Sequence, residues 1–134
     1  MYLNRLSKEQ KGLFIDMCIH AAMANDIFAE EEKMLIKQYC KEMHVSEPWY
    51  EARNSLDEVC QRLLEISKTS ELKIMIFNIT ELMLSDSDYD EDETNFMNKL
   101  VKKLKLGSDV HKNALIHIEK VMALYSEIDS FIFG

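Results

Sequence analysis

Hydrophobic residues recur at helical spacing along most of the chain. Residues three, four and seven positions apart lie on one face of an α-helix, so such a stripe indicates a helix with one buried side. The stripes predict six main helices, which run from about Lys8 to Ala24, from Glu30 to near His44, from Ser55 onward, from Glu71 to about Ser85, from Asp90 to Gly107 and from Ser108 to the region of Tyr125. No segment alternates as a half-buried strand would.

Residues that favour helix starts support several of these boundaries. Ser7 and Ser55 are each followed three positions later by Gln or Glu, the spacing of a capping box. Thr69 or Ser70 is the expected cap of the helix that contains Glu71. The local sequence therefore predicts where these helices begin, independently of their hydrophobic stripes.

A further short helix is predicted after Ser46. Pro48 follows this candidate cap within two residues, and proline is favoured in the first turn of a helix. The short helix would carry Trp49 and Tyr50 into the core. With it, the count rises to about seven helices.

The composition agrees with an all-α fold. The 134 residues include 3 Gly and 1 Pro, few for the many turns of a sandwich or barrel, and 47% are hydrophobic, enough for one core. We therefore expect residues 1–134 to form a single-domain bundle. The side chains expected in its core include Trp49, Phe96, Leu100, Ile118 and Met122, and also Cys18, Cys40 and Cys60, which are expected to be reduced and buried.

The acidic charge is concentrated in one window. The chain has 16 Lys and Arg against 24 Asp and Glu, a net charge of −8, and the window from Asp86 to Glu93 contributes six acids and no base, which leaves −2 for the rest. This balance argues against general nucleic-acid binding and against anionic membrane surfaces. No apolar run suggests a signal peptide or a membrane span, so the expected location is cytoplasmic.

The two segments from Ala22 to Glu32 and from Met83 to Glu93 align without a gap. In each, a small residue precedes an amide or acid, an aromatic residue follows three positions later, and a glutamate ends the frame. Both segments join two predicted helices. The chain is therefore predicted to consist of two related helix-loop-helix halves.

The second of these loops is a candidate site for a divalent cation such as Ca²⁺. Asp86, Asp88 and Asp90 alternate and Glu93 follows, which could place several carboxylate oxygens around a hard cation. The EF-hand pattern is absent, because the sixth position is not Gly and the twelfth is Met97. A solvated acidic turn at a helix N-terminus explains the same residues and is the default interpretation.

The first loop is a poorer candidate. It offers Asn25, Asp26 and Glu32 as possible ligands, with fewer carboxylates ahead of its helix. His20 could join it, and Asp16 lies four residues earlier on the same face, where it could orient the imidazole. A helical histidine is more often an ordinary packed or surface residue.

Motifs of common enzymes are missing from the sequence. It contains no G-x-S-x-G, P-loop, Gly-rich dinucleotide turn or H-E-x-x-H. Acid–base catalysis by the carboxylates has no second catalytic element to support it. We therefore expect a non-enzymatic protein without catalytic or cofactor-binding residues.

The two loop frames, M-A-N-D-I-F-A-E-E-E and L-S-D-S-D-Y-D-E-D-E, resemble those of the TerB-like family of tellurite-resistance-associated domains. That family carries a motif near A-D-G-x-Φ-x-x-x-E, with Φ apolar, at a helix-loop-helix junction in each half. The resemblance spans roughly Phe14 to Leu106, and Asp86, Glu93 and Glu32 fit the motif. The departures are Asn25 for Asp, Asp26 and Ser87 for the two Gly, and Ala29 where a Ser cap is common.

The resemblance implies a cytoplasmic, non-enzymatic domain associated with stress response or metal resistance. Its acidic face would bind a metal or a protein partner. The main alternative is a scaffold or oligomerisation domain that acts through its apolar C-terminal segment, where Phe131, Ile132 and Phe133 could dock in another chain. Packing of these three residues on their own core is the expected arrangement, and the oligomeric state is left open.

Overall fold

The computed structural model describes residues 1–25, 28–46, 48–85 and 90–134, without the side chain of Asn25. Six α-helices and two short 3₁₀ helices account for most of these residues, and none of them is in a strand. The elements are η1 (Leu3–Arg5), α1 (Lys8–Ala22), η2 (Met23–Asn25), α2 (Glu30–Glu42), α3 (Leu56–Ile66), α4 (Thr69–Leu84), α5 (Glu91–Lys103) and α6 (Asp109–Phe133). The all-α prediction is confirmed for this part of the chain.

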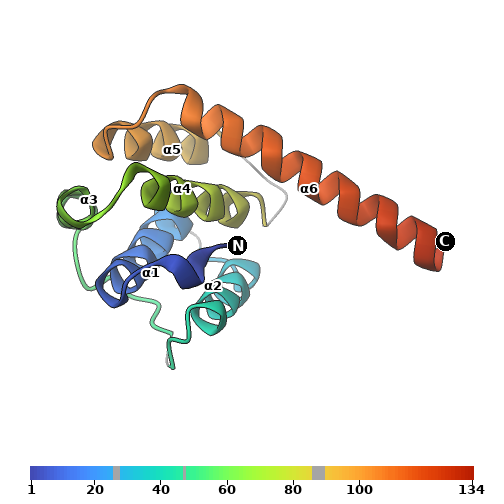
Figure 1. Cartoon of the computed structure of the whole chain (residues 1–134), viewed down its shortest axis with the longest axis horizontal. Helices are drawn as coiled ribbons and strands as arrows, with labels where there is room; N and C mark the ends of the chain where they lie inside the picture. The colour runs from blue at the N-terminus through green and yellow to red at the C-terminus, as the bar shows by residue number, and fades with distance from the viewer. Residues whose placement is uncertain (26–27, 47, 86–89) are drawn as a thin grey trace.

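The core is built around α1, which contacts α2, α3, α4 and α5 (Figure 1). Its residues from Leu13 to Ile19 are all buried, so this helix has no solvent-facing side over two turns. Phe14 of α1 packs against Tyr39 of α2, with ring centroids 5.8 Å apart. Met75, Ile76 and Ile79 of α4 are fully buried in the same cluster.

The predicted short helix after Ser46 is wrong. Residues 48–55 form an irregular loop with bends. The backbone N–H groups of Arg53 and Asn54 donate to the carboxylate of Asp16 on α1, at 2.9 and 3.0 Å. Tertiary hydrogen bonds thus replace the intrahelical bonds that a helix here would form. Trp49 is half-buried and packs on the core from this loop.

The capping residues are partly as predicted. Ser7 and Ser55 both accept a hydrogen bond from the backbone N–H three residues later, at 3.2 Å. In α4, however, the N-cap is Lys68 rather than Thr69 or Ser70, and its backbone N–H donates to the carboxylate of Glu71 at 2.8 Å. Here the N3 acid accepts from the N-cap backbone N–H, whereas the side chain of Lys68 provides no cap hydrogen bond.

Two helices end on non-glycine residues in the left-handed region. His44 after α2 has φ 59° and Lys105 after α5 has φ 55°. The bonds from Leu106 N to Val101 O and from Lys105 N to Lys102 O, both 3.0 Å, form the two-bond motif that closes a helix C-terminus. The predicted stop at Gly107 is therefore two residues late, whereas the expected end near His44 is confirmed.

The burial predictions hold for most core residues and fail at Met122 in the second half of α6. Leu100 and Ile118 are buried and Phe96 is partly buried, and all three cysteines are free and buried. Met122 was expected in the core, but 52% of it is exposed. The reason is that α6 packs against α4 and α5 with its first half and then projects from the bundle (Figure 1).

None of the helices in the described ranges is both long and apolar enough to cross a membrane.

Candidate functional site

Glu32 and Glu93 hold matching positions at the starts of α2 and α5. Each is the third residue of its helix and only 2% exposed, although glutamate is seldom fully buried without a partner. The Glu32 carboxylate accepts from the backbone N–H of Ala29 at 3.0 Å, and that of Glu93 accepts from Asp90 at 3.3 Å. Both acids thus bond to an otherwise free backbone group at a helix start.

The two starts differ in their N-cap residue. The Asp90 carboxylate accepts a hydrogen bond from the backbone N–H of Glu93 at 2.8 Å, so the capping box of α5 is complete. Ala29 has the same extended backbone conformation, with φ −68° and ψ 153°, but its methyl group accepts nothing. The alanine at this N-cap therefore leaves α2 without the side-chain cap hydrogen bond that Asp90 provides at α5.

The remaining candidate metal ligands are only partly described. Asp86, Asp88 and Asp26 lie outside the described residues, and Asn25 is placed only as the end of η2. Asp90 is exposed, and its carboxylate is the N-cap of α5. The short helix η2, which ends at Asn25, contacts α5. Among the described residues no group of three or more acids, histidines or cysteines is arranged to hold a metal ion.

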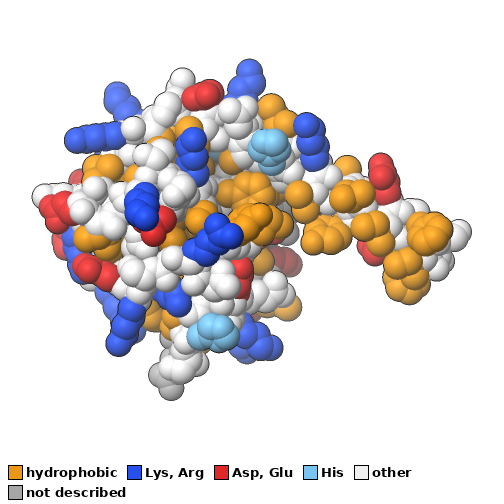
Figure 2. All heavy atoms as spheres, viewed as in Figure 1, with side chains coloured by type: hydrophobic (Ala, Val, Ile, Leu, Met, Phe, Trp, Pro, Cys, Tyr) orange, Lys and Arg blue, Asp and Glu red, His pale blue; other side chains and the backbone are white. Residues whose placement is uncertain are grey.

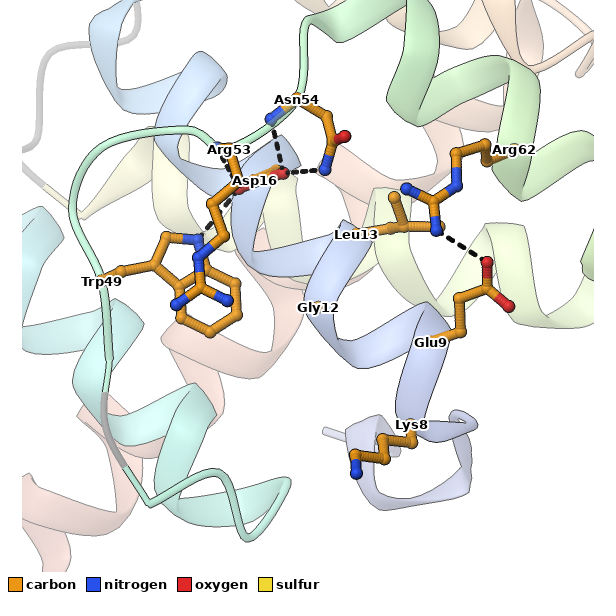
Figure 3. A pocket seen from close by; sticks show the side chains of 9 residues that line it. All are labelled: Lys8, Glu9, Gly12, Leu13, Asp16, Trp49, Arg53, Asn54 and Arg62. Atoms are coloured by element: carbon orange, nitrogen blue, oxygen red, sulfur yellow. Dashed lines mark hydrogen bonds and ion pairs between the residues drawn. The ribbon is translucent and has the colours of Figure 1, made fainter.

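Asp16 connects α1 to the loop of residues 48–55 (Figure 3). This carboxylate is 1% exposed and accepts four hydrogen bonds, two from backbone N–H groups, one from the indole Nε1 of Trp49 at 2.9 Å and one from Nδ2 of Asn54 at 2.8 Å. Burying a carboxylate is costly unless donors replace its water, and here both oxygens are satisfied. Asp16 is therefore a structural anchor rather than a free acid or base.

The possible orientation of His20 by Asp16 is not what the structure shows. The imidazole Nε2 of His20 lies 2.8 Å from the carbonyl oxygen of Asn54 instead. The side chains of Asp16 and His20 nevertheless contact the same loop, because each forms a hydrogen bond with Asn54. Asp16 and His20, four residues apart, thus lie on one face of α1 that binds the loop of residues 48–55. The sequence alone does not indicate which loop this face would bind.

A shallow groove of about 460 Å³ lies beside this anchor, with Gly12 on its floor (Figure 3). The Arg53 guanidinium stacks over the Trp49 ring at 3.7 Å, and Arg62 forms an ion pair with Glu9 at 2.8 Å on the opposite wall. Lys8 adds a third cation at the rim. Asp16 is saturated by donors, Arg62 is paired with Glu9 and Arg53 lies over Trp49, so each of these side chains already has a partner within the chain.

The cysteines do not provide a reactive centre. Burial raises the pKa of the Cys40 and Cys60 thiols to about 11, and raises that of Cys18 well above its usual value. The thiolate is the nucleophilic form, so these groups are unreactive near neutral pH.

The most exposed apolar surface lies on the second half of α6. Seven residues follow one another at alternating three- and four-residue steps, and we call them the α6 seam: His111, Ala114, Ile118, Val121, Tyr125, Ile128 and Ile132. The first three are buried against the bundle, Val121 is partly covered, and the last three are exposed. The seam therefore continues past the edge of the bundle without interruption (Figure 2).

Further apolar side chains widen the exposed part. We call Val121, Tyr125, Ile128 and Ile132 the distal seam, and Met122, Leu124 and Phe131 flank it. Among the large apolar residues of this half, the exposed fraction runs from 41% at Ile128 to 88% at Phe131. The expectation that Phe131, Ile132 and Phe133 pack on their own core is wrong, because α6 continues straight as a helix to Phe133.

No protein-family model matches this chain, and the comparisons found no similar curated protein or solved structure.

Proposed function

We propose that this chain is a non-enzymatic helical module that binds a protein helix through the distal seam of α6. The observation that carries the proposal is the exposure of this seam, since Tyr125 is 62% and Ile132 59% exposed in a stripe with helix-pairing spacing. A single protein chain in water seldom leaves so many adjacent large apolar side chains uncovered.

The helical state of this segment adds support. The sequence from Val121 to Phe133 contains several β-branched and aromatic residues, which are moderate helix formers, and isolated helices of this length are marginal in water. Here the segment extends a helix already docked on α4. A partner along the distal seam would supply the packing that normally stabilises an amphipathic helix.

A photo-crosslinking residue in place of Tyr125 tests this proposal, with the same replacement at Tyr2 as the matched control. Both tyrosines are exposed, at 62% and 53%, but Tyr2 lies at the other end of the chain. We expect irradiation of cells that produce the protein to yield a protein adduct at Tyr125, mapped by mass spectrometry to a helical segment. Equal yields from the two positions would contradict the proposal.

A second candidate function is binding of a divalent cation such as Ca²⁺, or of a protein partner, at the acidic start of α5. The observation that favours it is the matched burial of Glu32 and Glu93, together with six acids in the eight positions from 86 to 93. The resemblance to TerB-like domains adds an expected role in stress response or metal resistance. On this hypothesis Asp86, Asp88, Asp90 and Glu93 bind the ion, with Asn25, Asp26 and Glu32 as the weaker equivalent.

Thermal unfolding with the Asp86→Asn variant separates a cation site from a solvated turn. A bound cation raises the melting temperature by mass action, so excess Ca²⁺ should stabilise the wild type beyond NaCl at equal ionic strength, and the variant should lose this difference. Asp129→Asn, an exposed acid on α6, serves as the control for charge alone. If Ca²⁺ and NaCl stabilise all three proteins equally, the cation site is excluded and repulsion among the acids explains the effect.

A further inference from the structure

We propose that the occupant of the distal seam is a second copy of this chain, whose own α6 pairs with it in antiparallel orientation. This inference rests on the proposed function and goes further by naming the partner and the geometry. The periodicity of the seam, its exposed area and the position of α4 support a second copy as the partner.

The periodicity matches a helix pair. Steps of three and four residues repeat from His111 to Ile132 and average 3.5 residues, the spacing that keeps a stripe facing one partner helix along its length. The first half of this stripe already faces the bundle, where α6 contacts α4 and α5. The distal seam therefore continues an existing helix–helix interface, and another helix of similar periodicity fits it.

The exposed area is of the size that a stable dimer needs. A fully exposed large side chain offers roughly 200 Å², so the exposed fractions of Met122, Leu124, Tyr125, Ile128, Phe131 and Ile132 correspond to at most about 700 Å² that a partner could cover. A standard interface buries about 800 Å² from each partner. Two identical faces of this size complete an interface by twofold symmetry, the commonest arrangement of soluble oligomers.

The position of α4 decides the orientation. In a parallel pair the second α6 would also run beside Ala114 and Ile118, but the bundle of the first copy already covers these residues. Figure 1 shows the second half of α6 extending away from the bundle. In an antiparallel pair the second helix passes only along this projecting half, so the two bundles would lie at opposite ends of the pair. Val121 then meets Ile132 of the second copy, and Tyr125 meets Ile128.

The projecting half offers enough length for this pairing. Its 13 residues from Val121 to Phe133 extend for about 20 Å at 1.5 Å per residue. Four seam positions fall within it, and each gains an apolar neighbour in the antiparallel register. The charged side chain of Glu127 lies off the seam, where it remains in water.

The mass of the purified full chain in solution tests the inference, measured by light scattering at micromolar concentration. We expect twice the chain mass for the wild type and for Ser130→Lys, which adds a charge on the opposite side of the helix. Ile128→Lys adds the same charge on the seam, and we expect one chain mass with an unchanged helical circular dichroism signal, because Ile128 does not pack on the bundle. A monomeric wild type, or a dimeric Ile128→Lys variant, would overturn the inference.

Engineered cysteines test the orientation independently. We expect a mixture of Val121→Cys and Ile132→Cys chains to form a mixed disulfide under mild oxidation, while either variant alone stays mostly reduced. Efficient self-crosslinking of either single variant would indicate parallel helices and refute the antiparallel pair.

The two proposals fail in different ways. If the wild type is monomeric and the Tyr125 probe still captures a helix of another protein, the second copy is refuted and the proposed function stands. If that probe gives no more adduct than Tyr2, the proposed function fails as well.

Discussion

Asp16 shows how one buried residue fixes a whole loop. Its carboxylate is the acceptor for donors from Trp49, Arg53 and Asn54, all more than 30 residues away in the sequence. Each of these donors would be left without its acceptor if the carboxylate were removed. Loss of a buried, charged acceptor costs more than loss of an exposed contact, because the donors stay desolvated.

We predict that Asp16→Ala lowers the free energy of unfolding by about 3 kcal/mol, since several buried donors lose a charged acceptor at once. Urea unfolding followed by Trp49 fluorescence measures this, and the folded variant should show a red-shifted emission. Glu9→Ala, on the same helix, removes an exposed ion pair with Arg62 and should cost about 0.5 kcal/mol. Equal losses for the two variants would show that Asp16 is no anchor.

The buried thiols predict a defined response to alkaline pH. Burial raises the pKa of Cys40 and Cys60 from 9.0 to about 11 in the folded protein. Because the pKa of these thiols is higher in the folded protein, their protonated form stabilises the folded state. This contribution to stability is complete below pH 9. It is lost as the pH rises towards 11, because the unfolded chain loses its thiol protons at a lower pH than the folded chain. Stability should therefore decline above pH 9.

The same shift sets the rate of thiol labelling. At pH 8 the folded protein should react about 100-fold more slowly than the urea-unfolded chain, because it holds correspondingly less thiolate. A colorimetric thiol assay with and without urea measures both rates. Rapid labelling of all three cysteines in the folded state would contradict the assignment of these residues to the core.

At the scale of elements, the two acidic helix starts provide a natural comparison. α5 has both bonds of its capping box, whereas α2 has only the bond from Ala29 N to Glu32. The backbone at Ala29 is already extended, as an N-cap requires. What the N-cap of α2 lacks is a side-chain oxygen that could accept from the backbone N–H of Glu32.

We predict that Ala29→Ser stabilises the protein by about 0.5–1 kcal/mol, because the hydroxyl can accept from the backbone N–H of Glu32. Asp90→Ala should cost about 1 kcal/mol by the reverse change. Chemical unfolding of both variants measures the differences. A loss of stability in Ala29→Ser would mean that the two starts are not equivalent in their capping geometry.

The elements themselves were largely predictable, because helix stripes and caps depend on neighbours in sequence. Ser7 and Ser55 caps and the acidic starts of α2 and α5 are visible without a structure. The loop of residues 48–55 was not, since its conformation depends on Asp16, which is distant in sequence and unremarkable on its own helix. Lys105 likewise adopts a left-handed conformation that residue type would assign to Gly107.

At the scale of the whole molecule, α6 extends beyond the bundle that it helps to build. Ala114 and Ile118 are buried where α6 packs on the bundle, and the same stripe continues through Tyr125 and Ile128 into solvent. Periodicity shows that a face is apolar but not which chain covers it, so the sequence placed Met122 in the core. The candidate metal residues are a different case, because Asp86, Asp88 and Asp26 fall outside the described part and their role remains a prediction.

The most direct test of the central claim is amide hydrogen exchange of α6 at two protein concentrations. Pairing with a second copy should slow exchange at the amides from Val121 to Phe133 as the concentration rises, while those from Ala114 to Ile118, packed on the bundle, stay unchanged. Ile128→Lys should abolish the concentration dependence. Exchange in the projecting half that is equally fast at both concentrations would contradict the claim that a second copy covers the distal seam.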